Sequence, residues 1–256
     1  MVQDFNIWEG VYPTWEEAPG DEDAFDDKVW LDKVTQRAQE ALNEFFSSAT
    51  ISPVTRIRDY ILPVAASMIG SSTEGDLRVM DFGGGMAASY FPLISSLPNP
   101  ENVEFHIIEE KSICIKSREI LGNFKKLHFH QQLPDNSNSF DIVHAGSSIQ
   151  YVEDWETLLA TFINYRPKLL VLEDLMAGDF KSFVTLQNYY GKKIRSWFLN
   201  INQIIEVVEP LGYKLIYKTQ FTHDILGKVG LLPMENFPLS HRLNYGSHLM
   251  FEQIKI

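Results

Sequence analysis

The chain contains 256 residues, of which 45% are hydrophobic, enough to bury one substantial core, and this favours one large domain over two. Its 22 Lys and Arg residues against 34 Asp and Glu residues give a formal net charge of -12, which argues against a nucleic acid as the substrate. The single cysteine, Cys114, excludes an intrachain disulfide, and no apolar run reaches the roughly 18 residues of a membrane span. We therefore expect a cytoplasmic protein without a membrane span.

The first 70 residues predict an N-terminal arm followed by a helical cap. Residues 1–27 combine acids and turn formers with aromatic residues, and aromatic side chains favour burial over disorder. A helix is predicted over 27–46, because Trp30, Val34 and Ala38 recur on one helical face. A second helix is predicted to begin at Ser52-Pro53 and to end at Gly70. We expect residues 71–256 to form the main α/β domain, on which the cap packs.

From Leu77 onward, short apolar strands alternate with helices. This pattern requires right-handed crossovers and a doubly wound, mostly parallel sheet with helices on both faces. The predicted strands are 78–82, 103–108, 127–130, 141–145, 169–173, 213–219 and 248–253, and the predicted helices are 87–96, 111–121, 155–165 and 202–210. Residues 221–245 contain several prolines and glycines and are predicted to form a long loop.

The segment LRVMDFGGGMA, residues 77–87, carries most of the functional signal. An apolar strand ends in Asp81 and is followed by Gly83, Gly84 and Gly85. Glycines at a strand-to-helix turn let a ligand approach the backbone closely. The Asp81 carboxylate would repel a phosphate and suits a ligand with positive charge or hydroxyl groups. This combination indicates a nucleoside cofactor without a pyrophosphate.

These motifs resemble class I S-adenosylmethionine-dependent methyltransferases. Asp81 to Ala87 matches the acid-x-Gly-x-Gly-x-Gly loop of that superfamily, with Ala87 at the last glycine position. Over nearly its whole length, the chain is also similar to a family of proposed methyltransferases associated with surface-polysaccharide gene clusters. That narrower match uses segments 8–18, 81–85, 150–151, 183–187 and 212–213. The resemblance implies a seven-stranded Rossmann-like fold and S-adenosyl-L-methionine as the cofactor.

The resemblance also implies roles for individual residues at the cofactor. The glycine loop would hold the methionine portion, with Asp81 attracting its ammonium group directly or through water. Glu109 ends the second predicted strand, where an acid binds the ribose hydroxyls, and Glu110 is the alternative in register. Other residues expected at the cofactor are Gln132 and Leu133 near the adenine, and Ala145 and Gly146 after the fourth strand.

Residues for the methyl acceptor are predicted with explicit alternatives. Glu173 and Asp174 end the fifth strand, and either is a candidate general base, although paired acids also form ordinary solvated strand ends. Gln150, Tyr151, Gln187 and Tyr12 are candidates for the substrate wall. For Tyr12 and Tyr151, packing in the core is the alternative interpretation. The expected partner is a small-molecule acceptor; the oligomeric state is not predicted.

The histidines do not predict a metal site. His144 is interpreted as a core histidine with satisfied hydrogen bonds, and a surface role is favoured for His128 and His130. The sequence therefore favours a methyltransferase that acts on a small molecule, such as a sugar or surface-glycan precursor hydroxyl. The alternative is a methyltransferase-like binding protein without chemistry. A nicotinamide oxidoreductase is disfavoured by the position of Asp81.

Overall fold

Seven strands form the central sheet of this computed structural model, which describes residues 5–22, 24–25, 28–47, 61–70, 75–135, 137–225 and 228–254. They are β2 (Leu77–Phe82), β3 (Val103–Ile108), β4 (Leu127–His130), β5 (Ile142–Gly146), β6 (Leu169–Leu175), β10 (Tyr213–Phe221) and β13 (Gly246–Gln253). Their spatial order is β10-β13-β6-β5-β2-β3-β4. Strand β13 pairs antiparallel with β6 and β10, whereas the other neighbours pair in parallel.

Helices cover both faces of this sheet because alternate residues of each buried strand point to opposite sides. On one face, α2 (Ile61–Gly70), α3 (Tyr90–Ser96) and α4 (Lys111–Leu121) pack with strand residues such as Val79 and Phe105. On the other face, α5 (Trp155–Asn164) and α6 (Ile201–Val208) pack with Met80 and Val143. The doubly wound, mostly parallel α/β fold predicted from the sequence is confirmed.

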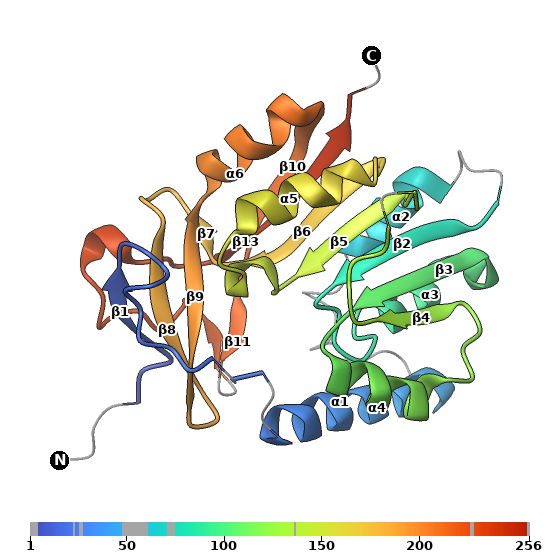
Figure 1. The fold of residues 1–256 in the computed structure, drawn as a ribbon, viewed down its shortest axis with the longest axis horizontal. Coiled ribbons are helices and arrows are strands. Elements are labelled where there is room, and N and C mark those ends of the chain that lie inside the picture. Colours follow the sequence, from blue (N-terminus) through green and yellow to red (C-terminus); the bar gives the residue numbers. More distant parts are fainter. Residues whose placement is uncertain are drawn as a thin grey trace.

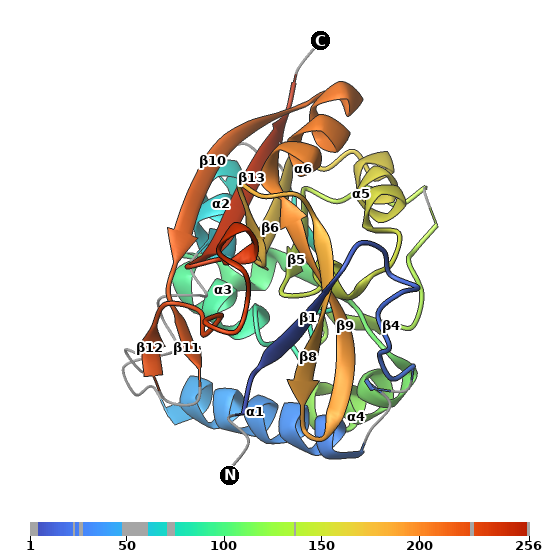
Figure 2. The ribbon, with the colours of Figure 1, turned by 90° about the vertical axis from the view of Figure 1, so that its left-hand side faces the viewer.

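A second, smaller sheet lies beside the carboxyl ends of the parallel strands (Figures 1 and 2). It contains β1 (Trp8–Tyr12), β8 (Phe183–Tyr189), β9 (Lys192–Asn200) and β7 (Ala177–Gly178), in the order β1-β8-β9-β7. Tyr190 and Gly191 connect β8 to β9 with φ angles of 49° and 84°, as in a two-residue type I′ hairpin. The prediction contains no strand in this region, so this sheet is a feature that the sequence interpretation missed.

Most predicted boundaries in the central sheet agree with the structure within two residues. The long loop predicted for 221–245 is wrong in part, because β11 (His223–Ile225) and β12 (Lys228–Gly230) pair there as an antiparallel ribbon. Short 3₁₀ turns are η1 (Pro100–Asn102), η2 (Ile149–Tyr151), η3 (Glu209–Leu211) and η4 (Leu239–His241). The predicted helix start at Ser52-Pro53 lies outside the described residues.

The N-terminal helix α1 (Lys28–Ser47) runs beside α4 at the lower edge of Figure 1. Its apolar face includes Val34 and Ala38, which pack with Met86 from the glycine loop and Ile113 from α4. In the part of the chain that the structure describes, no helix has both the length and the apolar character needed to cross a membrane. Helix α1 instead covers the segment that follows β2.

Candidate functional site

The glycine loop after β2 requires residues without side chains. Gly83 and Gly85 have φ angles of 68° and 57°, in the left-handed region that glycine enters without steric cost. A Cβ atom at Gly84 would collide with the carboxylate of Asp81, and one at Gly83 would lie 2.5 Å from the Ser148 Cβ atom. The backbone at Gly83 and Gly84 therefore lies so close to neighbouring side chains that a residue with a Cβ atom would not fit.

The last position of the glycine motif is occupied by Ala87. Its φ angle is 66°, and its side chain is fully buried in the apolar core beneath α3. A left-handed conformation costs an L-residue about 1–2 kcal/mol, which burial of the methyl group partly offsets. The loop therefore keeps a glycine-like backbone at a position where the sequence has alanine.

Asp81, at the end of β2, has two carboxylate oxygens in different environments. Its Oδ1 atom lies 2.7 Å from Nδ1 of His144 on the neighbouring strand β5. Its Oδ2 atom is buried beside Gly84 and makes no hydrogen bond within the described residues. A buried carboxylate oxygen without a hydrogen bond is costly. This atom is therefore a candidate acceptor for a donor that arrives with a ligand.

His144 links the ends of three adjacent strands. Its Nε2 atom lies 3.0 Å from Oε2 of Glu173 on β6, while its Nδ1 atom faces Asp81. Burial by itself would lower the pKa of His144, but the charges and hydrogen bonds of Asp81 and Glu173 outweigh it and raise this pKa to about 10. The imidazole is therefore a cation at neutral pH, and the interpretation of His144 as a core histidine with satisfied hydrogen bonds is confirmed.

Glu109 lies directly after β3 and contacts the glycine loop. Its Oε1 atom accepts a hydrogen bond of 3.0 Å from the Gly85 amide, and its Oε2 atom accepts one of 2.8 Å from the Glu110 amide. Burial raises the pKa of the Glu109 carboxyl, and these two amide bonds oppose that shift. Each oxygen has a second lone pair, so the carboxylate has capacity for two further donors.

The other residues predicted at the cofactor follow the neighbouring strands. Gln132 is exposed and Leu133 half-buried in the segment after β4, where Leu133 packs with the core under α5. Ala145 and Gly146 end β5 and lie beside Phe82 and Glu173 in the strand register. These segments leave the carboxyl edge of one sheet, as the predicted cofactor site requires.

The candidate substrate residues separate into two groups. The hydroxyl of Tyr151 in η2 donates a hydrogen bond of 2.7 Å to Oε1 of Gln187 on β8. Gln150 is buried beside them, and its Nε2 atom donates to the Ser147 hydroxyl and to the Asp174 carbonyl, both at 3.3 Å. Tyr12 lies elsewhere: it packs with Val184 and Leu186, which alternate with Gln187 along β8 and so point to the other face of the small sheet.

The two acids at the end of β6 have different surroundings. Glu173 faces the His144 imidazolium, whereas Oδ1 of Asp174 lies 3.5 Å from Nε2 of His223 on β11. The Asp174 amide donates a hydrogen bond of 3.2 Å to Nδ1 of His248 on β13. Asp174 has a φ angle of 53°, a strained conformation for a residue with a side chain.

His223 and His248 were not predicted at the site, because in the sequence they lie among scattered tail histidines. The antiparallel strand β13 brings His248 to the end of β6, and β11 brings His223 to the same point. Both rings pack against Phe221, with centroid distances of 4.4 and 4.2 Å. In the sequence, His248 begins a predicted strand and His223 lies in a predicted loop, so no local pattern placed the two histidines at one point.

A row of aromatic side chains connects η2 to α1 and to the end of β8. Phe25 contacts Tyr151 and Trp30, with ring centroids 5.4 and 5.9 Å apart. Trp30 in turn contacts Tyr189 at the tip of β8, at 5.6 Å. The arm, helix α1 and the β8–β9 hairpin therefore share one aromatic cluster next to Tyr151.

Comparison with known proteins supports the fold assignment. No protein-family model and no curated protein matches the sequence. Among solved structures, one similar chain comes from a complex of the Haloferax volcanii methyltransferase activator Trm112 with a candidate methyltransferase. The two chains are 12% identical, the TM-score is 0.54, and the match covers 88% of this chain and 96% of the other. Candidate S-adenosylmethionine-dependent methyltransferases from Listeria monocytogenes (7% identity, covering 75% and 98% of the two chains) and Methanosarcina mazei (11%, covering 74% and 98%) both give a TM-score of 0.50.

These similarities show the fold alone, a Rossmann-like α/β architecture of the kind found in these methyltransferase structures. At identities this low the comparison defines architecture, and the chemistry has to be argued from the residues of the site.

Proposed function

We propose that this protein is an S-adenosylmethionine-dependent methyltransferase that acts on a small molecule, with a sugar or surface-glycan precursor hydroxyl as the acceptor. The observation that carries the proposal is the buried Oδ2 atom of Asp81, which makes no hydrogen bond within the described residues and lies against the glycine loop. A cationic ammonium group of an amino-acid moiety satisfies such an oxygen, and a phosphate does not.

In this proposal, residues after β2, β3, β4 and β5 each contact a different part of the cofactor. Asp81 and the loop 83–87 hold the methionine end, and Glu109 uses its remaining lone pairs for the ribose hydroxyls. Gln132 and Leu133 border the adenine, and Ala145 and Gly146 leave space along the ligand. When bound, the cofactor supplies a methyl group already activated by its sulfonium, so the protein mainly aligns the acceptor.

For the organisation of the chain, we propose that residues 1–70 form the arm and helical cap and that residues 71–256 form the α/β domain on which they pack.

Gln150, Tyr151 and Gln187 are proposed to orient the acceptor. The Oε1 atom of Gln150 is buried and makes no hydrogen bond among the described residues, so it is suited to accept a hydrogen bond from a hydroxyl group. The Tyr151 hydroxyl is already engaged with Gln187, and burial raises the pKa of Tyr151, which keeps it protonated. Tyr12 would then contribute only as part of the arm, on the far side of β8.

We assign the proton-accepting role to Asp174 in preference to Glu173. The Glu173 carboxylate is engaged by the His144 imidazole at 3.0 Å, which leaves it less available to an acceptor hydroxyl. Asp174 faces His223 instead, and a carboxylate next to an imidazole can receive and pass on a proton from a hydroxyl.

Cofactor binding is tested by calorimetry with S-adenosylmethionine and S-adenosylhomocysteine. The wild type is expected to bind both, and Gly84→Ala is expected to weaken both by at least about tenfold, because the new methyl group displaces the Asp81 carboxylate. Gly230→Ala is the matched control, since open space surrounds that glycine. If the wild type binds neither compound at millimolar concentration, the proposal is wrong.

The general base is tested by transfer of labelled methyl groups to a panel of sugars and nucleotide sugars. Asp174→Asn is expected to lower kcat by about 10²–10⁴-fold with cofactor affinity retained. Asp179→Asn, at an exposed position, serves as the control. A larger loss of kcat in Glu173→Gln than in Asp174→Asn would move the role to Glu173. Tight cofactor binding without transfer to any acceptor would favour a binding protein without chemistry.

A further inference from the structure

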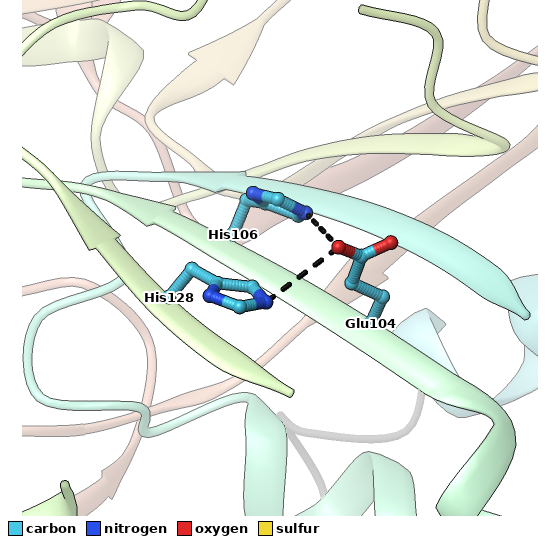
Figure 3. Close-up of side chains that lie close together, drawn as sticks. All are labelled: Glu104, His106 and His128. Atoms are coloured by element: carbon cyan, nitrogen blue, oxygen red, sulfur yellow. Dashed lines mark ion pairs between the residues drawn. The ribbon is translucent and has the colours of Figure 1, made fainter. Parts of the chain in front are cut away.

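Three potential metal ligands lie together near the edge of the sheet, on the face opposite to α3 and α4 and away from the cofactor loops. Glu104 and His106 belong to β3, and His128 belongs to the edge strand β4 (Figure 3). His106 and His128 are direct partners in the parallel register, and Glu104 points to the same side because it precedes His106 by two residues. Helices α3 and α4 pack on the opposite face, with Phe105 and Ile107.

The ligand atoms have the spacing of a coordination sphere. Oε1 of Glu104 lies 3.3 Å from Nε2 of His106 and 3.6 Å from Nε2 of His128, and all three atoms lie within 4.8 Å of one another. Two ligands bound tetrahedrally at about 2.0–2.1 Å from a metal are separated by about 3.3 Å. The two distances from Glu104 are therefore close to the separation that a common ion requires, and the third distance, between the two histidine nitrogens, is at most 4.8 Å.

Neighbouring residues orient the ligand atoms toward the same point. Nδ1 of His106 lies 3.0 Å from Nε2 of His130, and a proton shared there leaves Nε2 of His106 with its lone pair toward Glu104. Nε of Arg78 donates a hydrogen bond of 3.0 Å to Oε2 of Glu104, so that Oε1 faces the histidines. This is the arrangement of outer contacts by which proteins fix histidine and carboxylate ligands.

His106 provides the second, independent indication of a ligand. His106 is buried, with 9% of the residue exposed, and its Nε2 atom makes no hydrogen bond with any residue that the structure describes, although Oε1 of Glu104 lies 3.3 Å away. A buried imidazole nitrogen that makes no hydrogen bond costs free energy. A metal ion bound at this atom would supply the missing interaction.

We propose that Glu104, His106 and His128 bind one divalent transition-metal ion of the zinc type, with the fourth position open to water. Imidazole nitrogen with one carboxylate oxygen is a ligand set that Zn²⁺ prefers, whereas Mg²⁺ prefers oxygen ligands throughout. The ligands lie within strands β3 and β4 and not in the loops after their carboxyl ends. The ion would therefore have a structural role, in which it links the short edge strand β4 to β3. This site is independent of the proposed methyl transfer.

The test is calorimetric titration of the untagged, chelator-treated full-length protein with Zn²⁺. One ion per chain is expected for the wild type. His106→Gln, His128→Gln and Glu104→Gln are each expected to weaken binding by at least about 100-fold, and His130→Phe, which removes only the outer contact, by about 10–100-fold. His241→Gln is the matched control, because that histidine lies in η4 and outside the cluster. Unchanged affinity in His106→Gln and His128→Gln, or no binding by the wild type, overturns the proposal.

A second measurement separates loss of ligands from loss of fold. Co²⁺ in place of Zn²⁺ is expected to give the visible absorption of a tetrahedral site in the wild type and not in His128→Gln. Zn²⁺ is expected to raise the melting temperature of the wild type, and Mg²⁺ is not. Binding of S-adenosylhomocysteine, measured with and without Zn²⁺, reports on the cofactor site separately. The proposal fails if His128→Gln, shown to be folded by circular dichroism, keeps the Co²⁺ spectrum.

Discussion

At the scale of single residues, the contact between His144 and two acids decides the electrostatics of the candidate site. Asp81, His144 and Glu173 are all buried, and a buried imidazolium is tolerated only because both of its nitrogen atoms face carboxylates. Two carboxyl groups face one imidazole, so acidic groups outnumber the basic group in this cluster. This acidic excess lies next to the glycine loop and favours a cationic ligand there.

This arrangement predicts a specific pH dependence of stability. Because the folded-state pKa of His144 is raised from 6.5 to about 10, its stabilising contribution is complete below about pH 6.5 and is lost as the pH rises through 10. Denaturant unfolding of the wild type and His144→Gln between pH 7 and 10 should therefore show a difference of several kcal/mol that narrows as the pH rises. A constant difference over this range would contradict the charged state of His144.

At the scale of elements, strongly periodic segments were predicted well and the small sheet was not. Helix α4 and strand β4 agree with the prediction at both ends, because their apolar patterns are local and are bounded by clear turns. Strands β8 and β9 were missed because Tyr190-Gly191 lacks the Asn-Gly or Asp-Gly pair that usually marks a two-residue hairpin turn. Their flanks mix aromatic, polar and basic residues. Their buried face depends on segments far away in the sequence, because Phe183 and Phe198 pack with Trp8 of β1 and with the segment 232–243.

The aromatic cluster between α1 and the hairpin predicts that these elements stabilise each other. Trp30→Ala is expected to lower the free energy of unfolding by about 1–3 kcal/mol, less than for a fully buried tryptophan because Trp30 is half-buried. Hydrogen exchange should become faster in α1 and at the tip of β8. Trp15→Ala is the control, since Trp15 stacks on Trp197 and packs with Val184 and Leu186 of the small sheet; equal acceleration of α1 exchange in that variant would rule out the coupling.

At the scale of the whole molecule, the formal net charge of -12 sets the kind of partner that the protein can approach. We expect no measurable association with RNA at about 0.15 M salt, because the release of counterions from nucleic acid requires a basic surface. Fluorescence anisotropy with a labelled structured RNA checks this expectation. Saturable binding that weakens steeply with added salt would reveal a local basic surface and would make a nucleic-acid substrate the better interpretation.

The sequence by itself determined the architecture of the central sheet and the position of the glycine loop, since both follow from apolar periodicity and from glycines at one strand end. The roles proposed for Asp81, Glu109 and Asp174 stay predictions that the experiments above test. Only the tertiary structure decided which side chains meet: His144 with two acids, His223 and His248 with Asp174, and Glu104 with His106 and His128. These contacts depend on strand order and register, which bring together residues far apart in the chain, and local sequence patterns do not contain that information.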